Sequence, residues 1–363
     1  MSDYRQFAGT RPVADALRFD VAALARYLHA NIAGFAGPLD VVQFKGGQSN
    51  PTYKLTTGGK SYVLRRKPPG KLLPSAHAID REYRVIRALA GSAVPVARTH
   101  CLCLDETVIG TPFYLMDFVD GRILWDPLLP GMAREERGAI YAEMNRVIAA
   151  LHRIDFAAIG LADYGRPGNY LARQIDRWSR QYQASATETI DSMDRLIEWL
   201  PRHIPPGERT SLVHGDFRLD NMIFDKHEPR VLAVLDWELS TLGDPLADFA
   251  YHLMTWRLAP NEFRGLRGCD FAALGIPTEA EYVAMYLRDN PTLEQPDGQA
   301  WDFYMAYNMF RMAGILQGVL RRALAGNAAS EQALEAGRRA RPLAELAWKQ
   351  VEERSRAQET RRG

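Results

Sequence analysis

Residues 212–224 read LVHGDFRLDNMIF, and residues 231–238 read VLAVLDWE. Both stretches contain a short apolar run of strand length, and a turn-rich connection joins the two runs. This pattern predicts a small hairpin that presents three oxygen-bearing side chains at one edge, those of Asp216, Asn221 and Asp236. One such residue alone is usually a loop cap or a turn residue. Two carboxylates and an amide in this order predict a hard-oxygen site suited to Mg²⁺, with one carboxylate left to orient a hydroxyl group.

The order of this motif resembles the catalytic and metal-binding segments of the aminoglycoside phosphotransferase and choline kinase family, which is related to the protein kinases. The resemblance implies that Asp216 is the catalytic base and that Asn221 and Asp236 hold Mg²⁺. Arg218 stands where protein kinases place a Lys that touches the transferring phosphate, so the resemblance implies a catalytic role for it as well. Asp236 is followed by Trp-Glu and not by Phe-Gly. This departure favours small-molecule kinases over protein kinases.

Bulk composition limits the class of protein. The 363 residues are enough for two lobes with separate cores. The net charge is +1, from 45 basic and 44 acidic residues, so we expect neither nucleic acid nor a membrane as a partner. The three cysteines form no C-x-x-C pair, and the N-terminus lacks the apolar core of a signal peptide, so we expect a cytoplasmic protein. Polar residues interrupt the apolar segment 301–320, which predicts a buried helix.

A β-rich half precedes a helical half. Gly58 and Gly59 predict a two-residue hairpin turn because both tolerate positive φ. The order of elements matches the kinase-like fold, so we expect an α+β, bilobal chain with an N-lobe at residues 1–117 and a C-lobe at residues 118–363. The elements predicted for the first half are helices at 21–32 and 76–90, the second capped by Ser75, and strands at 41–44, 52–57, 60–65, 96–104 and 113–119.

A glycine-containing loop, KGGQS at residues 45–49, lies between two predicted strands. Glycines there let backbone N–H groups approach phosphate oxygens. The loop matches neither common phosphate-binding glycine pattern, and two glycines between strands most often form only a turn. Its place in the family order implies that Gly46, Gly47, Gln48 and Ser49 bind the nucleotide.

The strand after the hairpin carries Val63 and Arg65, which period-two alternation puts on one face. The resemblance places Arg65 at the phosphate-binding Lys of protein kinases, and a guanidinium can grip phosphate oxygens bidentately. The alternative is an exposed basic strand end. For the adenine edge, the resemblance implies the Asp117 carbonyl and the Val119 N–H as hydrogen-bonding groups, with Met116 beside them.

Glu82 falls on the apolar face of the predicted helix at residues 76–90. A buried carboxylate is costly unless it meets a cation, so we expect an ion pair with Arg65. The resemblance gives the same pair in kinases and places Glu82 in the nucleotide-binding set. The alternative is a solvated helix charge paired with Arg81 or Arg87.

Four other polar residues are interpreted as structural. Asp244 and Asp248 are expected to brace the catalytic loop through backbone N–H groups. His152 is expected to be a core-facing helix residue. His214 is expected to orient the loop and not to shuttle protons, because Asp216 already supplies that role.

These parts predict an enzyme that moves the γ-phosphoryl group of ATP to a hydroxyl of a small molecule, with ATP and Mg²⁺ as cofactors. A protein kinase ranks lower, because the interval between Asp236 and Asp248 leaves no room for a long activation segment. A catalytically inactive nucleotide-binding protein also ranks lower, because the acidic catalytic positions are all present.

The chemical class of the acceptor is the least constrained feature. Antibiotic kinases tend to have an acidic pocket for polycationic sugars, but the sequence from Arg257 onward carries 15 basic and 14 acidic residues. The helix at 301–320 and the residues after it resemble kinase-like domains that precede acyl-CoA dehydrogenase modules. This resemblance implies a hydroxylated acyl compound or its CoA ester. The aromatic- and Met-rich helix with its interrupting arginines predicts an amphipathic pocket in which Arg311 or Arg321 meets a carboxylate or a CoA phosphate. The alternative is that this helix is core and its arginines pair with nearby acids. The alternative acceptor is an aminoglycoside, another antibiotic or an amino alcohol.

Overall fold

The structure is a computed structural model that describes residues 9–46, 50–69, 78–207, 209–325 and 331–362. The chain forms two compact units, each discontinuous in sequence. The predicted division into lobes after residue 117 stays a prediction, and two later segments group with the sheet in one compact unit. Backbone hydrogen bonds show why: the Val234 N–H donates to the Pro95 carbonyl, and Arg122 and Phe224 exchange a pair of bonds. Unit 1 comprises residues 1–125, 156–164 and 218–240, and unit 2 comprises residues 126–155, 165–217 and 241–363.

A six-stranded antiparallel sheet in the order β1-β2-β3-β4-β6-β5 forms the centre of unit 1. The tight turn between β3 and β4 is the predicted Gly58-Gly59 hairpin, with φ of 53° and 76° and with Thr57 paired to Lys60. The predicted strands are confirmed, with ends that shift by at most three residues. They are β2 (Asp40–Phe44), β3 (Thr52–Thr57), β4 (Lys60–Arg66), β5 (Thr99–Cys103) and β6 (Phe113–Asp117), and β1 (Thr10–Arg11) adds an edge.

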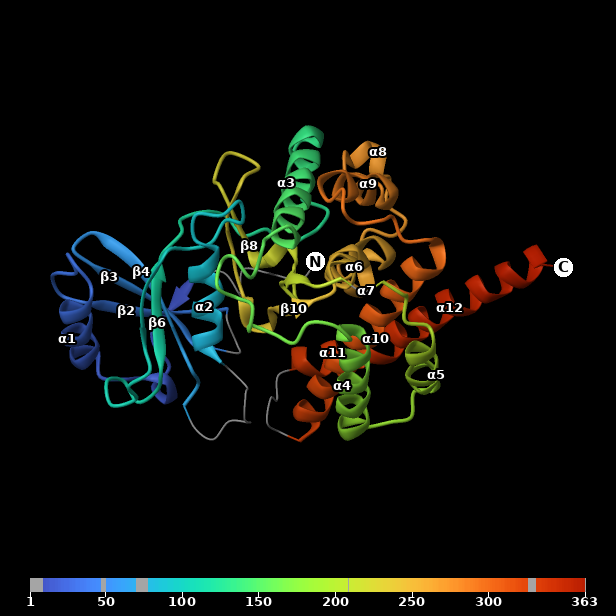
Figure 1. The fold of residues 1–363 in the computed structure, drawn as a ribbon. Coiled ribbons are helices and arrows are strands. Elements are labelled where there is room, and N and C mark those ends of the chain that lie inside the picture. The colour runs from blue at the N-terminus through green and yellow to red at the C-terminus, as the bar shows by residue number, and fades with distance from the viewer. Residues whose placement is uncertain (1–8, 47–49, 70–77, 208, 326–330, 363) are drawn as a thin grey trace. The chain divides into compact units, whose positions relative to one another are not determined.

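Two helices cover opposite faces of this sheet (Figure 1). Helix α1 (Val21–Asn31) buries Leu24 and Leu28 against the face that carries Tyr62 and Leu64 of β4. Helix α2 (Ile79–Leu89) contacts β5 and β6 on the other face, toward which Val63 and Arg65 alternate. Ala78 is not helical, so α2 begins later than predicted, and the expected cap Ser75 lies outside the described residues.

The rest of unit 1 contains the predicted second hairpin. Strand β8 (Met222–Phe224) pairs with β9 (Val231–Val234), and Met222 lies opposite Val234. Short 3-10 helices flank this hairpin: η4 (Leu219–Asn221) precedes it and η5 (Trp237–Leu239) follows it. Another such helix, η2 (Asp15–Leu17), precedes α1.

Unit 2 is mostly helical, as predicted. Its one described strand pair joins β7 (Ser211–Val213) to β10 (Thr241–Gly243). The predicted buried helix is α10 (Gly298–Leu324), and no described helix combines the length and apolarity needed to cross a membrane. The other helices are α3 (Arg134–His152), α4 (Tyr170–Ser185), α5 (Asp191–Trp199), η3 (Leu200–Arg202), α6 (Pro245–Arg257), α7 (Pro260–Phe263), α8 (Phe271–Leu274), α9 (Glu279–Asp289), α11 (Glu331–Arg338) and α12 (Ala340–Arg362).

Candidate active site

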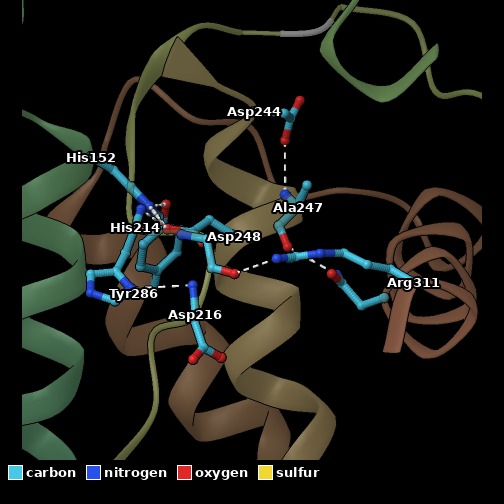
Figure 2. A network of polar contacts seen from close by, with 10 residues as sticks. His152, His214, Asp216, Asp244, Ala247, Asp248, Tyr286 and Arg311 are labelled. Atoms are coloured by element: carbon cyan, nitrogen blue, oxygen red, sulfur yellow. Dashed lines mark hydrogen bonds and ion pairs between the residues drawn. The ribbon is translucent and has the colours of Figure 1, made fainter. Parts of the chain in front are cut away.

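The buried carboxylate of Asp248 holds the loop that carries Asp216. This loop follows β7 in unit 2, and the Asp248 side chain on α6 accepts hydrogen bonds from the backbone N–H groups of His214 and Gly215, both at 2.8 Å. Figure 2 shows the Asp248 side chain beside this loop. The prediction that Asp248 braces the loop is confirmed.

Two histidines complete the surroundings of Asp248. His152 on α3 places Nε2 3.1 Å from the Asp248 carboxylate and Nδ1 2.6 Å from the Tyr286 hydroxyl (Figure 2). His214 accepts a hydrogen bond from the Asp216 backbone N–H at Nδ1, at 3.2 Å. Burial alone raises the pKa of Asp248, but its hydrogen bonds and nearby imidazoles outweigh burial and hold that pKa below its usual range. His152 is a buried residue of α3, as predicted, and the role of His214 stays a prediction.

Asp244 lies at the start of helix α6. Its side chain accepts a hydrogen bond from the Ala247 N–H at 2.9 Å and caps the first turn of α6. The Tyr304 hydroxyl donates to its second oxygen at 3.4 Å. The Asp244 carboxylate thus satisfies a helix N-terminus that begins with Pro245, and its expected role as a brace of the catalytic loop stays a prediction. The Asp-Pro order at a helix start is a capping signal in the sequence.

Two residues that the sequence analysis did not connect with Asp216 hold its side chain and its loop. The Tyr251 hydroxyl, on α6, donates to Asp216 Oδ1 at 2.6 Å. Arg311, on α10, donates to the Gly215 carbonyl at 2.6 Å, and its guanidinium lies 5.0 Å from the centre of the Tyr251 ring. Figure 2 shows Arg311 reaching the loop from its own helix. The spacing of Tyr251, three residues after Asp248 on one helix, is the sequence signal for its position.

Asn221 and Asp236 are neighbours at one end of the β8–β9 hairpin in unit 1. The Leu235 N–H donates to the Asn221 carbonyl at 2.8 Å, which places the residue before Asp236 beside Asn221. Asp236 has a φ of 64°, in the left-handed region that non-glycine residues rarely adopt. Arg218, predicted to touch phosphate, lies 3.6 Å from the Asp220 carboxylate. The boundary between the units falls after Phe217, so Asp216 belongs to unit 2 and these residues belong to unit 1.

Arg65 joins two carboxylates within unit 1. Its Nε lies 3.3 Å from Glu82 Oε2, and its terminal nitrogen donates to Asp236 Oδ1 at 3.4 Å. Glu82 is 2% exposed and Arg65 is also buried, so both alternatives, an exposed strand end and a solvated helix charge, are wrong. The contact with Glu82 has ion-pair distance without hydrogen-bond geometry. Burial raises the pKa of Glu82 to about 7 although Arg65 acts in the opposite direction.

The predicted adenine-binding residues lie on the central strands. Val63 on β4 is paired directly with Met116 on β6, and both side chains are buried. The Asp117 carboxylate is 2.6 Å from His100 Nε2, while Val119 follows the end of β6. Gly46 follows the end of β2. The other predicted loop residues, Gly47, Gln48 and Ser49, lie outside the described residues.

The donor atoms of Asn221 and Asp236 fit Mg²⁺. In nucleotide sites this ion is held by one or two carboxylates together with substrate phosphates, so a complete protein cage is not required. Across the described ranges, no group of three or more His, Cys, Asp and Glu could hold a metal ion. The Asp236 carboxylate is partly exposed and already faces a cation, the Arg65 guanidinium. A hard cation shared with phosphate oxygens therefore suits these two residues.

The fold and these residues define a class of protein, the phosphotransferases of protein-kinase-like fold that act on hydroxyl groups of small molecules. Residues 40–294 match the model of the phosphotransferase enzyme family. This match covers more than half of the chain, and the chain belongs to that family.

Three comparisons show which proteins resemble this chain. Acyl-CoA dehydrogenase family member 10 of Mus musculus is 48% identical over 343 residues, which are 93% of this chain and 32% of the relative. The chain thus spans about a third of that relative's length. A solved structure from Ralstonia eutropha JMP134, provisionally assigned as an aminoglycoside phosphotransferase, is 57% identical with a TM-score of 0.85, covering 93% of this chain and 99% of the other.

The third comparison concerns the fold alone. A mutant of aminoglycoside phosphotransferase APH(4)-Ia, solved as a ternary complex with ADP and hygromycin B, is 18% identical with a TM-score of 0.56. It covers 89% of this chain and 98% of the other. The predicted kinase-like, bilobal fold class is confirmed.

Proposed function

We propose that this protein transfers the γ-phosphoryl group of ATP to a hydroxyl of a small acyl compound or of its CoA ester. Residues 1–117 form the nucleotide-binding lobe in this proposal, and residues 118–363 supply the catalytic loop and the acceptor pocket. The observation that carries the reaction type is the arrangement of Asp216, whose loop is held by two backbone bonds to Asp248 and whose carboxylate is oriented by Tyr251. A carboxylate fixed in this way can orient an acceptor hydroxyl and accept its proton.

The nucleotide side of the proposal is supported by the charge arrangement around Arg65. This guanidinium cannot lose its charge and is held between Glu82 and Asp236, so it is available to grip phosphate oxygens. Mg²⁺ on Asn221 and Asp236 would neutralise phosphate charge when bound. Arg218 would add a further cation, and Val63, Met116, Asp117 and Val119 would bind the adenine. The complexes of similar fold with ADP support ATP as the donor.

The acyl acceptor is supported by two features. The curated mouse relative carries the name of an acyl-CoA dehydrogenase, and its matching part is about a third of its length. Next to Asp216, aromatic and cationic groups gather, since Arg311 lies 5.0 Å from the Tyr251 ring and 5.6 Å from the Trp178 ring. Such surroundings suit an acyl chain or an anionic ester better than a polycationic sugar. Arg311 itself already binds the loop, so Arg321 is the better candidate for an anionic group of the acceptor.

A second candidate acceptor is an aminoglycoside, because the structure from Ralstonia eutropha is provisionally assigned to that activity at 57% identity. The two candidates differ in the charge of the compound that the pocket must hold. A hydroxyacyl-CoA carries several negative charges, whereas an aminoglycoside carries several positive ones.

An acceptor screen tests the proposal. ADP release and phosphorus NMR of the product would be measured with Mg²⁺ and ATP against hydroxyacyl-CoA esters, free hydroxy acids, hygromycin B, other aminoglycosides, choline and aminopropanol. We expect a phosphorylated hydroxyacyl product and loss of nearly all turnover in Asp216→Asn, with ATP binding retained. Phosphorylation of aminoglycosides or amino alcohols alone would reject the acyl acceptor. Near-normal turnover in Asp216→Asn would reject the assigned base.

A further inference from the structure

A short segment between two helices of unit 2 belongs to unit 1 and ties helix α2 in place. This segment, residues 156–164, is named the strap here. Arg84 of α2 forms an ion pair with the Asp163 carboxylate and donates to the Gly160 carbonyl at 2.7 Å. Arg81, one turn earlier, donates to the Tyr164 carbonyl at 2.7 Å. The guanidinium of Arg81 also lies 4.2 Å from the centre of the Tyr164 ring. The strap therefore holds the helix that carries Glu82.

The hydroxyl of Tyr164 extends this attachment to a second element. Its oxygen is 2.7 Å from Ser240 Oγ, and Ser240 Oγ donates to the Trp237 carbonyl at 2.5 Å. A hydroxyl has one proton to donate, and either oxygen can be the donor in the bond between Tyr164 and Ser240. The Arg81 carbonyl, at 3.2 Å, is another acceptor for the Tyr164 proton. Tyr164 is 1% exposed, so water does not replace these bonds.

Ser240 closes the short helix η5, which begins directly after Asp236. Its backbone N–H also donates to the Trp237 carbonyl, at 3.0 Å, while the Trp237 indole donates to the Val234 carbonyl at 3.0 Å. Asp236 itself is in the left-handed backbone region, which costs a non-glycine residue free energy and persists only where neighbours impose it. The bonds of Trp237 and Ser240 hold the chain on both sides of Asp236, and we infer that they maintain its left-handed conformation.

Two separate chains of contacts connect Asp236, the proposed metal ligand, with helix α2. On one side, Asp236 meets Arg65 and Arg65 meets Glu82 of α2. On the other side, α2 reaches back through Tyr164 and Ser240 to η5 and so to Asp236. Arg65, on β4, lies 3.3 Å from Glu82 and 3.4 Å from Asp236, and a small movement of α2 would lengthen the contact with Glu82. The hydrogen bond between the Tyr164 and Ser240 hydroxyls restrains the movement of α2 relative to η5.

We propose that Tyr164 is a positioning residue for the metal-binding carboxylate: its hydroxyl, acting through Ser240, fixes the backbone of Asp236 and the distance from Asp236 to helix α2, whose Glu82 contacts Arg65 of β4. The inference rests on the proposed function, in which Asp236 binds Mg²⁺ together with the phosphates of ATP. In this arrangement the metal site is assembled before nucleotide arrives, and α2 does not act as an independently moving switch.

The test measures ATP affinity by calorimetry with Mg²⁺ and with EDTA, and takes the ratio of the two dissociation constants. Removing one hydroxyl link in Tyr164→Phe is expected to reduce the enhancement by Mg²⁺ about fivefold, the typical worth of one hydrogen bond. Affinity in EDTA should change little. Ser240→Ala should have a similar effect, and the double variant should be no worse than either single variant, because both break one chain of bonds.

A matched control separates positioning from general stability. Tyr53, also in unit 1 and fully buried, donates from its hydroxyl to the Leu17 carbonyl at 3.0 Å and accepts from Arg66 Nε at 3.1 Å. Tyr53→Phe removes a buried hydroxyl of the same kind without touching η5. It should lower the midpoint of urea unfolding as Tyr164→Phe does, yet leave the Mg²⁺ enhancement at the wild-type value.

Two results would overturn the inference. If Tyr164→Phe keeps the wild-type enhancement, or if Tyr164→Phe and Ser240→Ala are additive, the hydroxyl link does not position Asp236. Asp236→Ala distinguishes this failure from failure of the proposed function. If Asp236→Ala retains the full Mg²⁺ enhancement, Asp236 is not a metal ligand, and the proposed function and the positioning role are rejected together. Loss of the enhancement in Asp236→Ala but not in Tyr164→Phe rejects the positioning role alone.

Discussion

Asp216 depends on neighbours that fix the direction of its side chain. Its carboxylate accepts the Tyr251 hydroxyl at 2.6 Å, and the ring of Tyr251 is in turn held beneath the Arg311 guanidinium at 5.0 Å. A proton acceptor is useful only when it points at the group that loses the proton, and a hydrogen bond to one carboxylate oxygen leaves the other oxygen aimed in a fixed direction. At this scale the orientation of one side chain is controlled by a residue that the motif itself does not contain.

Tyr251→Phe is therefore expected to lower kcat about tenfold or more, because a bond to a charged group is lost from the transition state, while KM for ATP stays nearly constant. The measurement is steady-state kinetics with the best acceptor from the screen. Tyr141→Phe is the matched control, since the Tyr141 hydroxyl is also buried in unit 2 and donates to the Pro127 carbonyl at 2.7 Å. Equal kinetic effects in the two variants would contradict a specific role for Tyr251.

Strand β4 and helix α2 share one buried ion pair, which links an element of the sheet to the helix that covers it. Alternation along β4 and the apolar face of α2 both put their charged residues inward, so Arg65 and Glu82 could be paired from the sequence alone. Burial raises the pKa of Glu82 to about 7. The carboxylate therefore needs its cation most at pH values where it is ionised.

We expect the stabilities contributed by Arg65 of β4 and Glu82 of α2 to be coupled. Arg65→Met should lower the free energy of unfolding more at pH 8 than at pH 6, because ionised Glu82 is then left buried without a cation. Glu82→Gln should remove that pH dependence, and the double variant should recover on the order of 1 kcal/mol relative to additive losses. Urea unfolding of the four proteins at both pH values measures this. If the losses of unfolding free energy in the two single variants are additive at pH 8, Arg65 and Glu82 are not coupled.

Elements with local signals were predictable, and links between distant segments were not. The Gly58-Gly59 turn, the β8–β9 hairpin and the position of Asp248 follow from patterns of a few residues. The capping role of Asp244 was not predicted, because a helix cap and a loop brace require the same residue type and only the position of the helix start reveals the cap. The strap at residues 156–164 could not be found, because its assignment to unit 1 depends on contacts with α2 more than 70 positions away in sequence.

Acid affects the two units of the molecule in opposite directions. In unit 1, the raised pKa of Glu82 means that the folded state binds a proton more readily than the unfolded state, so stability rises as pH falls from about 7 toward 4.5. In unit 2, burial lowers the pKa of His252 to about 4, although Asp248 acts in the opposite direction. Its folded form resists protonation, so that stability is complete above pH 6.5 and is lost as pH falls toward 4.

Mild acid should therefore destabilise unit 2 through the protonation of His252. At pH 5, about 1.5 units below the unfolded pKa of His252, the loss in unit 2 is on the order of 2 kcal/mol. The neutral imidazole is held at 2.9 Å from the Tyr282 hydroxyl, a bond that the amide of His252→Gln can partly replace without titrating. Urea unfolding followed by tryptophan fluorescence at pH 7 and pH 5 should show a smaller acid-induced loss of unfolding free energy in His252→Gln than in the unmodified protein.

The titration of Glu82 contributes equally in both proteins, so it cancels when the two losses are compared. Asp248 does not confuse the result, because its depressed pKa removes stability only below about pH 3.8, the ordinary value for an aspartate. An equal loss in both proteins would mean that His252 is not what makes unit 2 sensitive to acid.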